Sequence, residues 1–528
     1  MSSSNKVTLI EKVTNFSGKY WKEILFGTVV VITVGAGVVY LNKSNTKSTK
    51  KSKKPSEKLS ATNDKPRDTQ NLSETEIKEL ARTAKNMGNK LFGENKFDEA
   101  IQLYTEAIQL SPEAVYFNNR AACEARLKNW SKVISDCTEA LNRDPMYIKA
   151  LLRRATAYEH KNEFKESLND YSALCVLEEF KNTTSMASAD RVLKNLGTKI
   201  AAELIKDKVE RLPSDTFISA SSELADFLTI PEVSEADGIF KKAIMNIMKQ
   251  KYEEAKSNVD KSIELGNLSK DFEAFAYNLR GTFLFLVGNV DKAMVAFEKS
   301  IELDPTQVDS YIKKACLYME KGDTETCQKE FEAASKIKDD NVDFYYHRGQ
   351  IKHLIGELAD AMADFSKSLL YDPNLVYAKI QLGVTQYKSG QIQAANETFK
   401  EAEILFSNRS EVFNYQGEIY LDQGDDVKAL ESFDKAIQLN PNSSLPYINK
   451  ALLYLQARND AATAEKLLKK AIEIDPYGDV AFGPLAQLYL TQNRVAEARE
   501  VYDKSIAAAR TENELVTAVC SREAALAQ

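Results

Sequence analysis

Five polar side chains near the start of the chain have the types and spacing needed to bind carboxylates. They are Lys85 and Asn89 in AKNMGNKLF, Asn119 in YFNNRAAC, and Lys149 and Arg153 in IKALLRRATAY. Residues four apart share one face of a helix, so each Lys would stack on its partner. Three cations and two amides on one wall would hold a pair of carboxylates, such as a peptide C-terminus and a nearby acidic side chain. A single exposed Lys or Arg is ordinary solvated charge, so the prediction depends on all five lying in register.

The chain offers little for catalysis or metal binding. His347 and His353 are six residues apart, a spacing that does not stack them on one helix face, and His160 stands alone. No CxxC, P-loop, dinucleotide-binding or nucleophile-elbow motif occurs. The six cysteines fit positions of small buried residues; they are Cys123, Cys137, Cys175, Cys316, Cys327 and Cys520. We therefore predict no catalytic residue, metal or cofactor.

The elements that must position these side chains follow from a repeat of 34 residues. Four parallel series share this step: Phe297, Phe331, Phe365, Phe399 and Phe433; Gly281, Gly349, Gly383 and Gly417; Ala293, Ala361, Ala395 and Ala429; and Pro305, Pro373 and Pro441. This is the period of the tetratricopeptide repeat (TPR), a pair of antiparallel helices. The small residues mark close helix approaches, the aromatic residue fills the space between units, and the proline ends the second helix.

Repeats in this frame stack into an all-α superhelix with a concave groove. About eleven units are predicted, near 81–113, 114–147, 148–181, 236–269, 274–307, 308–341, 342–375, 376–409, 410–443, 444–478 and 479–512, followed by a helical cap. A three-repeat domain that carries the five polar residues would occupy 74–181, and a longer repeat domain 236–528. Between them, 182–235 is expected to be an irregular helical connector, because Pro213, Pro231 and the polar run 182–188 interrupt the pattern.

Charge is distributed unevenly along the 528 residues. Residues 1–72 hold 13 Lys/Arg and 5 Asp/Glu, whereas the rest holds 57 and 72. An acidic body of this kind lacks the cationic surface that general nucleic-acid binding requires, so no nucleic-acid partner is expected.

The basic N-terminal part contains a predicted membrane anchor. After a short segment, 1–23, residues 24–41 read ILFGTVVVITVGAGVVYL without a charge, which is barely long enough to cross a bilayer. A cleaved secretory signal is the alternative, but the apolar run is long and no clear cleavage site follows it. Residues 42–73 are polar and basic and are expected to form a flexible tether. The heavier lysine cluster on this side places the C-terminal domain in the cytosol.

The five polar residues resemble the two-carboxylate clamp of co-chaperone TPR domains. That clamp holds the EEVD tail of seventy- and ninety-kilodalton heat-shock chaperones. The resemblance implies that Lys85, Asn89, Asn119, Lys149 and Arg153 bind such a tail, because all five positions carry the family's residue types.

The order of anchor, basic tether, clamp domain and longer repeat domain resembles the large TPR preprotein receptors of the mitochondrial outer-membrane translocase. This resemblance covers essentially the whole chain. It implies a non-catalytic receptor in the mitochondrial outer membrane, with its N-terminus in the intermembrane space. Its partners would be the two chaperones, unfolded precursor proteins and other subunits of the translocase.

A site for precursors is sought on the groove side of the middle repeats, where apolar residues are frequent. The candidates are Ile312, Met319, Tyr346, Tyr377, Ile380, Val384 and Tyr387. An apolar groove with Met and aromatic side chains would tolerate many sequences. Packing of these side chains against neighbouring helices is the other interpretation.

Two other functions remain open from the sequence. The first is a scaffold or co-chaperone on a different membrane. The second is a regulatory subunit of a transferase whose active site lies on a partner.

Overall fold

The computed structural model describes residues 73–208, 212, 232–338 and 340–526, and within them every regular element is a helix. The predicted membrane segment 24–41, with the flanking segment 1–23 and nearly all of the tether 42–73, lies outside these residues. Among the described helices, none is long and apolar enough to cross a membrane.

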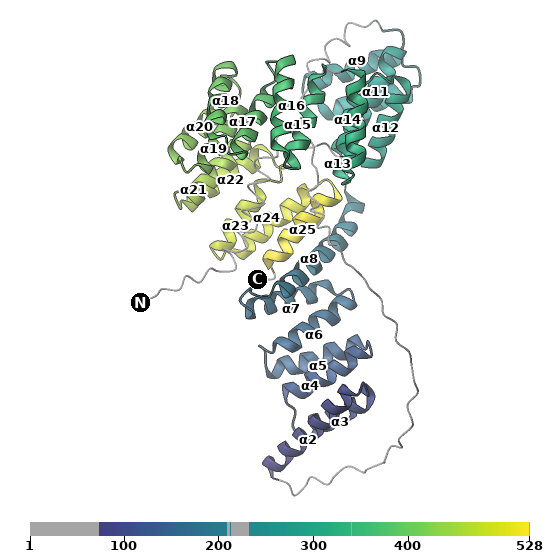
Figure 1. The fold of residues 1–528 in the computed structure, drawn as a ribbon, viewed down its shortest axis with the longest axis vertical. Coiled ribbons are helices and arrows are strands. Elements are labelled where there is room, and N and C mark those ends of the chain that lie inside the picture. Colours follow the sequence, from purple (N-terminus) through teal and green to yellow (C-terminus); the bar gives the residue numbers. More distant parts are fainter. Residues whose placement is uncertain (1–72, 209–211, 213–231, 339, 527–528) are drawn as a thin grey trace. The chain divides into compact units, whose positions relative to one another are not determined.

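The helices form antiparallel pairs, and within the first three pairs, as within the last eight, each pair packs on the next in chain order (Figure 1). The first three pairs are α2 (Glu74–Gly93) with α3 (Phe97–Leu110), α4 (Ala114–Arg126) with α5 (Trp130–Arg143), and α6 (Ile148–His160) with α7 (Phe164–Leu177). A long helix, α8 (Thr183–Leu204), and a short 3₁₀ helix, η1 (Ile205–Asp207), follow.

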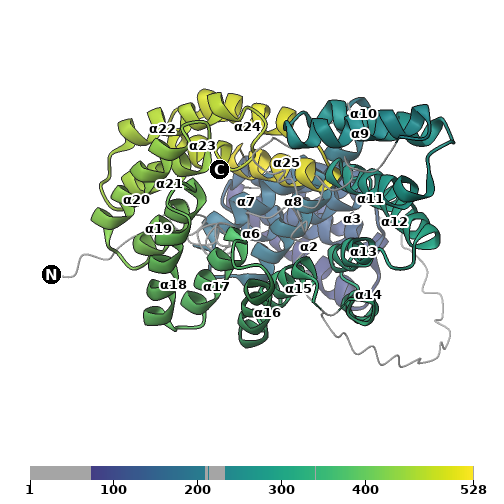
Figure 2. The same cartoon turned by 90° about the horizontal axis from the view of Figure 1, so that it is seen from above.

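Eight further pairs follow, and Figure 2 shows them in chain order along a curved array. They are α9 (Glu235–Met248) with α10 (Tyr252–Glu264), α11 (Lys270–Leu286) with α12 (Val290–Leu303), α13 (Val308–Glu320) with α14 (Thr324–Ile337), α15 (Val342–Leu354) with α16 (Leu358–Tyr371), α17 (Val376–Lys388) with α18 (Ile392–Leu405), α19 (Ser410–Asp422) with α20 (Asp426–Leu439), α21 (Leu445–Gln456) with α22 (Ala461–Ile474), and α23 (Phe482–Thr491) with α24 (Val495–Ala508). The final helix is α25 (Glu512–Leu526). The prediction of an all-α TPR superhelix with about eleven repeats is confirmed.

The chain divides into two compact units near residue 200. We call the helices from α2 to residue 199 the N-terminal module, and residues 200–522 the C-terminal module. One part of the sequence prediction is wrong at the junction: helix is interrupted at 178–182, not through the whole polar run to residue 188. The Asn182 side chain accepts a hydrogen bond from the Thr184 backbone N–H (3.1 Å), so the polar run starts α8 instead of breaking it.

The predicted small–aromatic contact is present in the pairs whose first helix carries glycine at this position. A Cβ built on Gly281, Gly383 or Gly417 would lie 2.6 Å from the ring of the phenylalanine sixteen residues later. The two helices can therefore approach this closely only because the glycine lacks a side chain. Each pair also turns through one residue with positive φ, which is glycine in five repeats, such as Gly356 and Gly390.

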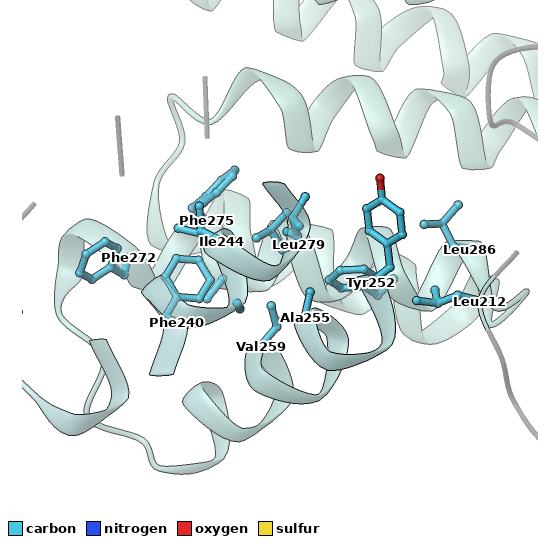
Figure 3. Packing of buried hydrophobic residues seen from close by; sticks show 14 of the residues in the cluster. Leu212, Phe240, Ile244, Tyr252, Ala255, Val259, Phe272, Phe275, Leu279 and Leu286 are labelled. Carbon is cyan, nitrogen blue, oxygen red and sulfur yellow. The ribbon is translucent and has the colours of Figure 1, made fainter. Parts of the chain in front are cut away.

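Aromatic packing begins the C-terminal module. Phe240 of α9 contacts Phe272 and Phe275 of α11, with ring centroids 5.5 and 6.1 Å apart. Figure 3 shows these rings at one end of a buried cluster that also includes Tyr252 of α10. The cluster joins the first two pairs of the module, so a repeat buries its apolar face against its neighbour, as a solenoid requires.

A polar cluster lies buried between α19 and α21. The Asn414 and Asn449 side-chain amides both donate to Glu418 Oε1, at 2.8 and 2.6 Å. No described group bonds to Glu418 Oε2 or to the Tyr415 hydroxyl, and both residues are buried. Burial raises the pKa of Glu418 to about 8, against the opposing effect of the two amides.

This pKa makes stability depend on pH. The folded state keeps the Glu418 proton up to about pH 8, while an unfolded glutamate loses it near pH 4.5, so stability falls as pH rises between these values. Glu418→Gln, whose amide oxygen still accepts from both asparagines, removes this fall of up to about 1.4 kcal/mol per pH unit. Thermal unfolding followed by circular dichroism should show a larger stabilisation at pH 8 than at pH 5.5. The exposed Glu397→Gln on α18 is the control, and an equal effect of Glu418→Gln at both pH values would contradict the expectation.

Candidate functional site

The five predicted clamp residues lie on the first helices of the three N-terminal pairs. Lys85 and Asn89 are on α2, Asn119 is on α4, and Lys149 and Arg153 are on α6. Every one of them is exposed or half-buried. Helices α2 and α4, and likewise α4 and α6, contact each other, so the three helices form one continuous wall.

Hydrogen bonds join members of the set across repeats. Asn119 Nδ2 donates to Asn89 Oδ1 at 3.1 Å, which brings the two amides into direct contact. Arg153 donates to the Asn118 backbone carbonyl at 3.1 Å and also to the Asn118 side-chain oxygen. Asn118 in turn donates to the Tyr147 hydroxyl at 3.1 Å. The Arg153 guanidinium is therefore held beside the residue that precedes Asn119.

The cations of the set lack counter-charges. Within the described residues, no carboxylate lies at ion-pair distance from Lys85, Lys149 or Arg153, and neither lysine ammonium has a hydrogen-bond partner. The neighbouring arginine behaves differently: Arg154 pairs with Asp170 through two hydrogen bonds, at 2.7 and 2.8 Å. Arg120 pairs with Asp136 in the same way, at 2.6 and 2.9 Å. The arginines that join helix pairs are neutralised, and the cations of the predicted clamp are not.

This arrangement suits an anionic ligand. Uncompensated cations beside amide donors can accept carboxylate oxygens through charge-assisted hydrogen bonds. Among the described residues, no cluster of His, Cys, Asp and Glu could hold a metal ion.

The predicted precursor groove has a different structure from the expected open apolar channel. Four of the seven candidates are at most 5% exposed: Ile312, Tyr346, Ile380 and Val384. The prediction that these four side chains line an open groove is therefore corrected, because they are buried. Ile312 packs with Phe331 and Phe344, and the Tyr346 ring lies 6.2 Å from that of Phe365. Ile380 and Val384 belong to one cluster that joins α17, α18 and α19. These side chains are buried because they pack against neighbouring helices.

The other three groove candidates are half-buried: Met319, Tyr377 and Tyr387. The hydroxyl of Tyr377 donates to Glu411 Oε1 at 3.3 Å, and that of Tyr387 donates to Asp422 Oδ2 at 2.8 Å. Burial, with the nearby carboxylate as a lesser cause, raises the pKa of each tyrosine to about 12. Sequence reasoning missed these acidic partners, although both stand on α19 one repeat further along.

Histidine chemistry finds no support in the described residues. Burial lowers the pKa of His347 to about 4, and burial together with Lys388 does the same for His353. His353 Nδ1 is bonded to the Thr385 hydroxyl at 2.8 Å. Both rings are neutral at physiological pH.

Comparisons with known proteins agree with this fold. Tetratricopeptide-repeat family models match residues 276–307, 296–329, 342–375, 410–443 and 455–522. The human mitochondrial import receptor subunit TOM70 is 33% identical over 85% of this chain and 79% of its own length. The Saccharomyces cerevisiae subunit of the same name is 30% identical over 87% and 82%. The crystal structure of yeast Tom70 matches with a TM-score of 0.52 and 29% identity, covering 85% of this chain and 96% of that one.

These relatives settle the family and the absence of a catalytic role. A fold of binding repeats and relatives named as receptor subunits make this chain a receptor and not an enzyme. Because relatives at 30% identity or more align over most of both chains, the chain belongs to the Tom70 family of mitochondrial import receptor subunits.

Proposed function

We propose that this receptor docks cytosolic heat-shock chaperones of the seventy- and ninety-kilodalton classes through a carboxylate clamp. The supporting observation is the group of uncompensated cations, Lys85, Lys149 and Arg153, beside the bonded amides Asn89 and Asn119. An acidic peptide tail supplies the missing negative charges: its terminal carboxylate and a side-chain carboxylate. The site lies in a body that is acidic overall, so it is a local exception to the charge of its surroundings.

The receptor would then take over unfolded precursors from the chaperone and pass them to other subunits of the outer-membrane translocase. Two weak contacts on one chain, one for the chaperone and one for the precursor, give avidity because the second contact becomes intramolecular. The half-buried side chains Met319, Tyr377 and Tyr387 are the candidate precursor contacts, and the four buried candidates support them from behind.

Residues 24–41 would anchor the receptor as a single span, with the N-terminus in the intermembrane space and both modules in the cytosol. The second candidate function, a co-chaperone on another organelle, differs from this proposal in its membrane and not in its clamp.

Arg153→Ala should abolish binding of a peptide ending in Glu-Glu-Val-Asp, because each charge-assisted hydrogen bond contributes about 1.5–3 kcal/mol. Isothermal calorimetry with the full chain measures the loss, and wild-type binding should weaken as salt is raised. Lys165→Ala, which removes an exposed cation from α7 of the same module, should leave the affinity unchanged. Wild-type affinity in the Arg153 variant would remove the clamp assignment.

A photo-crosslinker in place of Tyr387 should capture a precursor arrested during import into isolated mitochondria. The same crosslinker in place of Ile404, which is 79% exposed on α18, should not. Equal capture from both positions would show that the inner wall is not the contact surface.

Residues 1–60 fused to a fluorescent protein should localise to mitochondria. In the full chain, protease added to intact mitochondria should remove both modules. An endoplasmic-reticulum pattern would favour the second candidate function, and protected modules would contradict the proposed orientation.

A further inference from the structure

The amide of Asn89 is fixed by two neighbours. The Tyr104 hydroxyl donates to Asn89 Oδ1 at 2.7 Å, and Asn119 Nδ2 donates to the same oxygen at 3.1 Å. Both bonds go to one side of the amide, so its carbonyl oxygen is fully engaged. The Asn89 Nδ2 has no partner among the described residues, and both of its hydrogens remain available as donors.

The Tyr104 hydroxyl is not needed for the packing of the Tyr104 ring against Gly88. Tyr104 occupies the position of the repeated phenylalanines, and its ring covers Gly88 as Phe365 covers Gly349. A Cβ on either glycine would lie 2.9 Å from the ring, facing the same ring atoms. Phenylalanine performs this packing in the C-terminal module, so the ring serves the fold and the hydroxyl is free for another role.

The hydroxyl is a permanent donor at physiological pH. Tyr104 is 2% exposed, and burial raises the pKa of its phenol to about 12. The proton is therefore present throughout the range in which a receptor works, and the bond to Asn89 does not titrate.

We propose that Tyr104 is a positioning residue of the clamp: together with Asn119, it turns the Asn89 amide so that its NH₂ group faces the bound carboxylate. The inference rests on the proposed chaperone docking, which supplies the carboxylate. Without the hydroxyl, an amide held by Asn119 alone can rotate, and its oxygen would then face the carboxylate and repel it. Fixing the amide before binding removes that cost from the binding step.

The test compares variants of the full chain by calorimetry with a peptide ending in Glu-Glu-Val-Asp. Tyr104→Phe should keep the circular dichroism spectrum and the thermal midpoint close to wild type, and it should weaken binding about 2- to 10-fold, the value of one hydrogen bond. Tyr171→Phe is the matched control. It removes the hydroxyl at the same position of the third repeat, where the Tyr171 hydroxyl lies 3.3 Å from that of Thr156 and, among the described residues, bonds to no clamp residue.

A double-mutant cycle separates positioning from a general structural effect. In the Asn89→Ala background, Tyr104→Phe should cause no further loss, because its only route to the ligand is gone. A further loss of the same size would overturn the inference and leave the clamp intact. Full wild-type affinity in Tyr104→Phe, while Arg153→Ala loses binding, would do the same. If the wild-type chain does not bind the peptide, the clamp and the positioning role both fall.

Discussion

The close contact between a small residue and a ring sets the geometry on which both modules depend. Where Gly281, Gly383 and Gly417 face their phenylalanines, a single added methyl group would overlap the ring. Such a contact fixes the distance between paired helices and their relative register. Since the pairs with glycine at this position repeat it, equivalent positions of their first helices fall on the same wall. Any chemistry placed at one such position is therefore brought beside its counterparts in the adjacent repeats.

The same wall position has opposite consequences in the two modules. Arg153 lies two residues before the small residue Ala155, and Lys313 and His347 lie two residues before Ala315 and Gly349. Arg153 is half-buried, and no carboxylate of the described residues forms an ion pair with it. Burial lowers the pKa of both Lys313 and His347 in the C-terminal module. At Lys313 and His347, desolvation thus opposes a positive charge at this wall position.

The sequence predicted the helix pairs and the positions on the inner wall, which periodicity controls. It did not predict how deeply the wall residues are buried, which depends on the curvature of the array. The 34-residue series predicted the helix pairs. The four-residue spacing and the repeat together predicted that Asn89 and Asn119 lie on the same wall, and the structure shows a hydrogen bond between them. Periodicity places a residue on the inner wall, but it does not say how tightly the wall closes. For that reason Ile380 and Val384 were expected in an open groove and are instead buried. Polar residues are ambiguous in a similar way, because they can either end or start a helix. The polar run that begins at Asn182 predicted a break in the helix, but the Asn182 side chain accepts a hydrogen bond that starts α8.

Hydrogen bonds join the first and last parts of the C-terminal module. Arg510, just before α25, donates to the Leu286 carbonyl at the end of α11, 224 residues away in sequence, at 3.1 Å. Lys208 donates to the Ile506, Ala507 and Ala509 carbonyls at the end of α24. With the last repeat held against the second pair of the module, curvature cannot relax at one interface without strain at the others. The partly accessible tyrosines, Tyr377 and Tyr387, are tied to the next first helix by their hydroxyls, so each presents a half-buried ring with a hydrogen-bonded edge.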